Sequence, residues 1–138
     1  MREVATSSDP KKTFTSIVNA TVGPHEFMHF TEFDHGSWLP ILNCPTVKTA
    51  DGRLLKAKRF ILGNPLIAFT MLRWDLDAGL FVPVELLLVE EEDSGCRIVF
   101  LMPSGLIAGY EGVGMELSKA AEVLDGKLEG LVVDVLRE

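Results

Sequence analysis

The feature that most constrains this fold is the spacing of apolar residues near the end of the chain. From Leu117 onward they recur in steps of four and three, at Leu117, Ala121, Leu124, Leu128, Leu131 and Val135. This period is typical of an amphipathic helix with one buried face. Because such a helix is stable only when its stripe is covered, a sheet or other helices must lie against it. Gly126 and Gly130 lie within this helix, and each lowers helix stability by about 1 kcal/mol relative to alanine. A close neighbour that leaves no room for a side chain would explain their presence.

Four earlier segments have the pattern of strands. Alternation predicts a strand over Glu26–Phe33, with Phe27 and Phe33 on one side and Met28 and Phe30 on the other. Further strands are expected over residues 56–62, 80–90 and 96–102, the last two joined by the turn at residues 93–95. The strand over residues 80–90 is apolar on both faces, which favours a central position in the sheet.

Helix signals and loops separate these strands. Ser7-Ser8-Asp9-Pro10 is interpreted as a helix start, and a short helix is expected from Lys11 to about Thr21, although its β-branched and hydroxyl residues leave a strand as the alternative. Asn64-Pro65 starts a second helix, reaching about Trp74. We expect a single helical turn at residues 38–42, an exposed loop over residues 44–55 and an irregular glycine-rich segment over residues 103–114. The order predicts an α+β domain, with helices packed on one face of an antiparallel sheet.

Composition limits the classes of function. A chain of 138 residues fits one domain, residues 1–138, and is long enough to fold without a disulfide or a metal. The net charge of −7 disfavours nucleic acid, and the basic stretch from Lys48 to Arg59 is interpreted as the flank of a loop and an edge strand. No apolar run approaches a membrane span, and two distant cysteines do not form a secreted disulfide framework. We therefore expect a cytoplasmic protein without a membrane partner.

Two motifs carry a family resemblance. The segment Phe60-Ile61-Leu62-Gly63-Asn64-Pro65-Leu66-Ile67-Ala68, followed by Asp75-Leu76-Asp77-Ala78-Gly79-Leu80-Phe81-Val82-Pro83, resembles the domain-of-unknown-function family 302. The resemblance covers about residues 56–102, and the motifs of residues 33–38 and 62–66 are similar to fungal members. It implies a curved antiparallel sheet like that of the TATA-binding-protein class, and pairing as a homodimer. The cysteine positions of many members are Gly63 and Val84 here, which removes any thiol or metal role for that pair.

Candidate site residues follow from their chemistry. His35, beside Asp34, titrates near neutrality and suits general acid–base work, although it also fits a plain turn. Glu85 interrupts the most apolar strand, so it either lines a pocket or faces solvent. Substrate-binding candidates are Arg73, Tyr110, Asp34, Asn64 and Trp38, each of which also has a structural interpretation as a surface charge, loop packing, a cap or a helical turn.

Several kinds of site are disfavoured by spacing. His25 and His29 would lie about 13 Å apart on a strand, at about 3.3 Å per residue, which is too far to chelate one ion. The glycines at 105, 109, 112 and 114 lack the lysine and hydroxyl residue of a phosphate loop, and no Ser-His-Asp order is defensible. We expect no cofactor and no metal.

The sequence leaves two functions open. The first is a homodimeric protein with an apolar pocket for a hydrophobic, polyketide-like molecule, acting as a cofactor-free enzyme that cyclises, lactonises or hydrolyses it. His35 would transfer the proton, Glu85 would assist, and Arg73 or Tyr110 would hold a carbonyl or carboxylate. The second is a non-catalytic, homodimeric ligand-binding or interaction module. We predict that His35 and Glu85 open onto one pocket.

Overall fold

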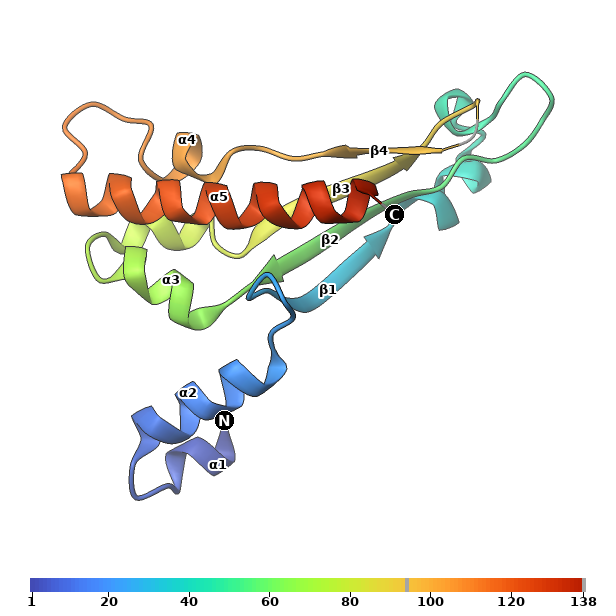
Figure 1. Cartoon of the computed structure of the whole chain (residues 1–138). Helices are drawn as coiled ribbons and strands as arrows, with labels where there is room; N and C mark the ends of the chain where they lie inside the picture. The colour runs from blue at the N-terminus through green and yellow to red at the C-terminus, as the bar shows by residue number, and fades with distance from the viewer. Residues whose placement is uncertain (94, 138) are drawn as a thin grey trace.

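The computed structural model describes residues 1–93 and 95–137 of the chain, and these form an α+β fold. Within them, four strands make an antiparallel sheet in the order β1-β2-β3-β4, with helices packed against it (Figure 1). The strands are β1 (Met28–Asp34), β2 (Ala57–Gly63), β3 (Val84–Glu90) and β4 (Cys96–Val99). The α-helices are α1 (Arg2–Ala5), α2 (Pro10–Thr21), α3 (Pro65–Leu72), α4 (Pro103–Ile107) and α5 (Met115–Arg137). Short 3-10 turns are η1 (His35–Ser37), η2 (Leu39–Leu42), η3 (Pro45–Val47) and η4 (Leu76–Leu80).

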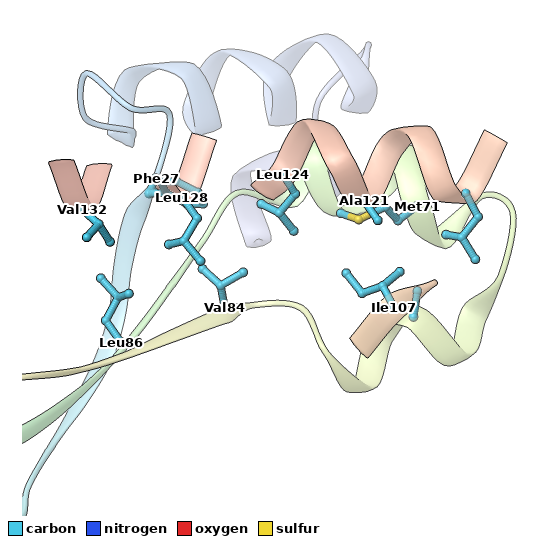
Figure 2. Close-up of a cluster of buried hydrophobic side chains, with 11 residues drawn as sticks. Phe27, Met71, Val84, Leu86, Ile107, Ala121, Leu124, Leu128 and Val132 are labelled. Atoms are coloured by element: carbon cyan, nitrogen blue, oxygen red, sulfur yellow. The ribbon is translucent and has the colours of Figure 1, made fainter. Parts of the chain in front are cut away.

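The long helix α5 covers one face of the sheet and closes the core. Leu124 and Leu128 are buried, and Leu128 points from α5 toward Val84 of β3 in the close-up of the core (Figure 2). Met71 of α3 and Ile107 of α4 pack against the same stripe from either side. The predicted amphipathic helix and its partner sheet are therefore confirmed.

The end of the buried stripe differs from the prediction. Val132 is buried, whereas Leu131 is only partly buried and Val135 is 45% exposed. An α-helix has 3.6 residues per turn, so side chains spaced seven residues apart shift around the helix axis by about 20° per repeat. The drift carries Leu131 toward one edge of the stripe and lets Val132 enter it at the other edge. Val135 lies 18 residues, or five full turns, after Leu117 and keeps the direction of the stripe, so its exposure goes with its place in the last turn of α5.

The pairing register separates the two faces of the sheet. Val84 and Leu86 of β3 face α5, so Glu85 and Leu87 point to the opposite face. Direct partners share a face, and Leu87 lies opposite both Arg59 of β2 and Val99 of β4. We call this second surface the open face, because its side chains at Phe33, Arg59, Glu85 and Val99 are all at least 40% exposed.

Strand β1 departs from the expected alternation. The register shifts between His29 and Thr31, which leaves Phe30 as an extra residue in the strand. As a result Phe27 enters the core, while Phe33 lies opposite Arg59 on the open face. The prediction that Phe27 and Phe33 share a side is wrong, because one extra residue exchanges the two faces.

The remaining elements are close to expectation, and the differences lie in strand bounds, one extra helix, one loop and the position of β2. The first segment is helical, and the side chain of Asp9 accepts a hydrogen bond from Lys12 N (3.1 Å) at its start. The central strand begins at Val84 rather than Leu80, and β4 ends at Val99 rather than Met102. The segment expected to be irregular contains α4, with Pro103 at its first position. The loop over residues 44–55 is not wholly exposed, because Val47 and Thr49 are buried in it. Strand β2 is internal, so the basic stretch does not flank an edge strand.

Candidate functional site

A hollow opens where β4 separates from β3. Pairing of these strands ends at Leu87 and Val99, and the following residues turn away toward α4 instead of continuing the ladder. The hollow has a volume of about 330 Å³. We call it the β3–β4 pocket. Its polar side chains are His35, Arg59 and Glu85, and its apolar lining includes Leu80, Phe81, Pro83, Leu87, Val99 and Leu101.

An ion pair forms the polar end of this pocket. Nε of Arg59 donates to Oε2 of Glu85 at 2.8 Å, and Nη2 of Arg59 lies 2.5 Å from Oε1 of the same carboxylate. The guanidinium also lies 5.6 Å from the ring centroid of Phe33, so a cation–π contact holds its other side. The hydrogen bond with Glu85 raises the pKa of Arg59 above its ordinary value. Two-point pairing fixes both side chains in the plane of the open face.

His35 reaches the same pocket from the turn that follows β1. The turn can fold back on β2 because Gly36 lacks a side chain: a Cβ there would lie 3.1 Å from backbone atoms of Lys56 and Ala57. The ring of Trp38 meets the His35 ring edge-on, with centroids 6.0 Å apart. His35 and Glu85, which sequence reasoning grouped, therefore line one hollow, with Arg59 as a third polar member.

Among the described residues, no hydrogen bond joins the Asp34 side chain to His35. Its carboxylate lies 3.8 Å from Nζ of Lys58, on the face of the sheet opposite to the β3–β4 pocket. The backbone oxygen of Asp34 stabilises the turn by accepting a hydrogen bond from Ser37 Oγ (2.7 Å). Adjacent residues on a strand point to opposite faces, which accounts for the separation of Asp34 from the pocket.

Two other candidate residues lie away from this pocket. Arg73 lies over the rings of Phe69 and Trp74, at 5.5 and 5.0 Å, on the exposed end of α3. Tyr110 donates its hydroxyl to Oδ2 of Asp75 (3.0 Å), and both line a separate hollow near η4. This hydrogen bond raises the pKa of Tyr110, because it stabilises the neutral phenol beside a carboxylate. The structure therefore does not bring Arg73 or Tyr110 together with His35.

Asn64 lines a second hollow, of about 230 Å³, beneath α3. We call it the α3 pocket. Asn64 is buried and caps α3, since its Oδ1 accepts from Leu66 N (2.8 Å) and its Nδ2 donates to the Glu26 backbone oxygen (2.8 Å). Both polar ends of the amide are therefore occupied by the protein itself. The capping interpretation of Asn64 matches the structure.

Side chains that could ligate a metal are dispersed over the residues that the structure describes. Among them, no three His, Cys, Asp or Glu side chains are grouped so as to hold a metal ion. The histidines lie at separate places: His25 pairs with Asp134 at 2.7 Å, His29 lies 3.7 Å from Glu32, and His35 lines the β3–β4 pocket. Over the same residues, no helix is long and apolar enough to cross a membrane. Cys44 and Cys96 are free thiols.

Sequence reasoning missed Arg59 as a site residue. It interpreted Arg59 as part of a basic stretch that flanks a loop and an edge strand. Three cations of that stretch are paired: Arg53 with Glu90, Lys58 with Glu32, and Arg59 with Glu85. The available signal was a cation in one predicted apolar strand and a carboxylate in another. Whether they meet depends on the register of β2 against β3, which the spacing of residues does not fix.

Fold and site together define a small α+β domain that has an uncovered sheet face and a ligand-sized, mainly apolar pocket on it. Comparison with known families then identifies the group. The model of the family described as "Domain of unknown function DUF302" matches residues 3–132, and the chain belongs to this family.

A solved structure supports the fold. The crystal structure of an uncharacterized conserved DUF302 protein from Bacillus stearothermophilus aligns with a TM-score of 0.61 at 17% sequence identity. The alignment covers 87% of this chain and 85% of that chain. At this identity the likeness extends to the fold alone. Comparison with curated proteins gives no match.

Proposed function

We propose that this protein binds a hydrophobic, uncharged small molecule in the β3–β4 pocket. The observation that carries the proposal is the lining of that pocket, which combines six or more apolar side chains with one charge-balanced polar end at His35, Arg59 and Glu85. Its volume of about 330 Å³ lies within the range of small-molecule sites, which begins at about 300 Å³. Such pockets typically use a few polar groups to orient a mainly apolar ligand.

The ion pair selects against charged ligands. An anion approaching Arg59 would also meet the carboxylate of Glu85, and a cation approaching Glu85 would meet the guanidinium. Arginine has five N–H donors, and the contacts with Glu85 use its Nε and Nη2 groups. The remaining donors are available to a carbonyl or hydroxyl oxygen. The pocket therefore fits a neutral molecule that carries one or two oxygen atoms at one end.

Two forms of this function follow from how His35 is used. In the catalytic form, His35 transfers a proton to or from the bound oxygen-bearing end, without a cofactor, in a cyclisation, lactonisation or hydrolysis. Glu85 is less available as a second base, because Arg59 already occupies both of its oxygens. This occupation favours the other form, a non-catalytic binding module. Polyketides are also neutral, mainly apolar molecules that carry oxygen atoms. Together with the motifs similar to fungal members, this favours a polyketide-like ligand.

The expectations from the family resemblance belong to the same proposal. They are a curved sheet like that of the TATA-binding-protein class and pairing into a homodimer. The cytoplasmic location expected from the composition is a further part of the proposal. Homodimer formation is supported by large apolar side chains that are exposed in the single chain, such as Ile41, Leu42 and Leu80. Light scattering at micromolar concentration tests it, since a stable species at the monomer mass of 15.2 kDa would exclude the dimer.

Ligand binding is tested with prodan, a fluorescent and uncharged naphthyl ketone. We expect saturable fluorescence enhancement with the native protein, and at least tenfold weaker binding to the Val99→Trp variant, which fills the pocket. Arg97→Trp is the matched control, because residue 97 lies on the same strand and face but outside the pocket lining. Equal binding to all three proteins would exclude the β3–β4 pocket as the site.

The polar end is tested separately. We expect Arg59→Leu to weaken prodan, because the donors for its carbonyl oxygen are lost. The preference for the ketone over 2-naphthoate should increase, because Glu85 then faces the anion without its counter-charge. Lys58→Leu, on the neighbouring residue of β2 and on its other face, should change neither. Native mass spectrometry of the protein as purified then identifies the physiological ligand. Turnover of that ligand by the native protein, lost in His35→Ala with binding retained, would establish the catalytic form.

A further inference from the structure

The α3 pocket differs from the β3–β4 pocket in that no charged side chain is among the described residues that line it. Asn64 is the polar side chain in its lining, and both ends of its amide bond the backbone at Leu66 and Glu26. The floor is formed by buried apolar side chains, among them Met71 and Leu124. A polar group entering this hollow would lose its water without gaining a partner, which costs free energy. The hollow therefore fits a hydrocarbon group.

Its size and position connect it to the neighbouring site. At about 230 Å³ it is below the usual range for a complete small-molecule site, which begins at about 300 Å³. Pro83 and Val84 line both pockets, so the two hollows adjoin at the start of β3. A space of this size beside a larger site suits one part of a ligand better than a ligand of its own.

Glycine at position 63 keeps this junction narrow and free of further side chains. A Cβ added to Gly63 would lie 2.6 Å from the Phe30 ring and 2.9 Å from Cβ of Pro83. Phe30 and Pro83 therefore approach each other directly above the backbone of β2, and both line the α3 pocket. Phe30 is 46% exposed, so its ring can move outward to admit a chain that passes Pro83.

We propose that the α3 pocket binds the hydrocarbon tail of the same ligand whose oxygen-bearing end lies in the β3–β4 pocket. The inference rests on the proposed function. It adds to it a ligand class, a neutral molecule with one oxygen-bearing end and an extended apolar tail. The tail passes Pro83 and ends against α3.

The test uses 2-alkanones of increasing chain length, from 2-heptanone to 2-tridecanone, in competition with prodan. Each buried methylene contributes about 0.8 kcal/mol, which is about fourfold in affinity. With the native protein, we expect affinity to rise about fourfold per methylene until both hollows are filled. With Ala68→Phe, which fills the α3 pocket, the rise should stop several carbons earlier while the shortest ketones bind as before. Ala68→Leu gives the same comparison with a smaller added side chain.

The matched control places the same new side chain on the other side of the helix. Thr70 is on the exposed surface of α3 and outside the pocket lining, so Thr70→Phe should follow the native series. Thermal unfolding of each variant confirms that it is folded. If short ketones bind and the native and Ala68-substituted proteins stop gaining affinity at the same chain length, the inference is wrong and the proposed function stands. If no ketone displaces prodan, both the inference about the tail and the proposed function are wrong.

Discussion

The buried stripe of α5 gives a sharp test of the fold through Leu128→Ala. Leu128 is fully buried, near the middle of the helix, and faces Val84 of the sheet (Figure 2). The substitution removes three carbon atoms from the core, which corresponds to about 2.4 kcal/mol of lost transfer free energy at ~0.8 kcal/mol per methylene. A residual cavity adds about 24 cal/mol for each Å³ that the surroundings fail to fill.

The surroundings of Leu128 decide where the cost lies between these limits. Val84 and Leu86 belong to an internal strand bonded on one side to β2 and on the other to β4, so they cannot move far toward the helix. We therefore expect the cavity to persist and the free energy of unfolding to fall by about 3–4 kcal/mol, within the range of about 2–5 kcal/mol for such changes.

Urea unfolding at fixed protein concentration measures this change. The midpoint should fall with an unchanged m-value, since the surface exposed on unfolding stays nearly the same. Leu136→Ala is the chemically matched control: it lies on the same helix but is 60% exposed, and should change stability by less than about 0.5 kcal/mol. A loss below about 1 kcal/mol for Leu128→Ala would show that α5 does not pack on the sheet through this face.

Three further predictions concern titration and charge. Tyr110 is the single tyrosine, so its ultraviolet titration can be followed directly; Asp75→Asn should lower its pKa, because the raised value comes mainly from the hydrogen bond to that carboxylate. The pKa of Cys44 is lowered mainly by the hydroxyl of Thr46. Thr46→Val should therefore reduce the thiolate fraction and slow alkylation of Cys44 by iodoacetamide at neutral pH. A double-mutant cycle between Arg59 and Glu85 should give a coupling free energy of about 0.2–1 kcal/mol that decreases with salt, and an unchanged value in high salt would contradict a solvent-exposed pair.

The elements that the sequence predicted well are those with local signals. Asp9-Pro10 and Asn64-Pro65 each place a capping side chain before a proline, and both helices begin there. The helical period of α5 is likewise a property of one segment. Interpretation failed where a local feature altered a longer pattern, as when Phe30 bulged out of β1 and exchanged the faces of its neighbours. It also missed α4, because the glycines around its short sequence indicated a loop while Pro103 marked a helix start.

The site was less predictable than the fold because it depends on contacts between strands. His35 could be placed near a sheet end, since it follows a predicted strand directly, but the pocket beside it exists only because β4 leaves β3 after Val99. That separation is set by where the chain must turn to start α4 under α5. The spacing of residues within β3 or β4 does not indicate where the two strands separate.

Glu85 shows how the missing register changes a chemical interpretation. In the sequence it is an isolated carboxylate in an apolar strand, and burial without a partner would favour its neutral form. In the folded chain Arg59, one strand away, meets both of its oxygens on the open face. The carboxylate is then one half of a neutral pair, and its effect on a ligand is exerted jointly with the guanidinium. Of the polar side chains in the pocket lining, His35 is the one outside this ion pair, so the acid–base chemistry proposed for the pocket would begin there.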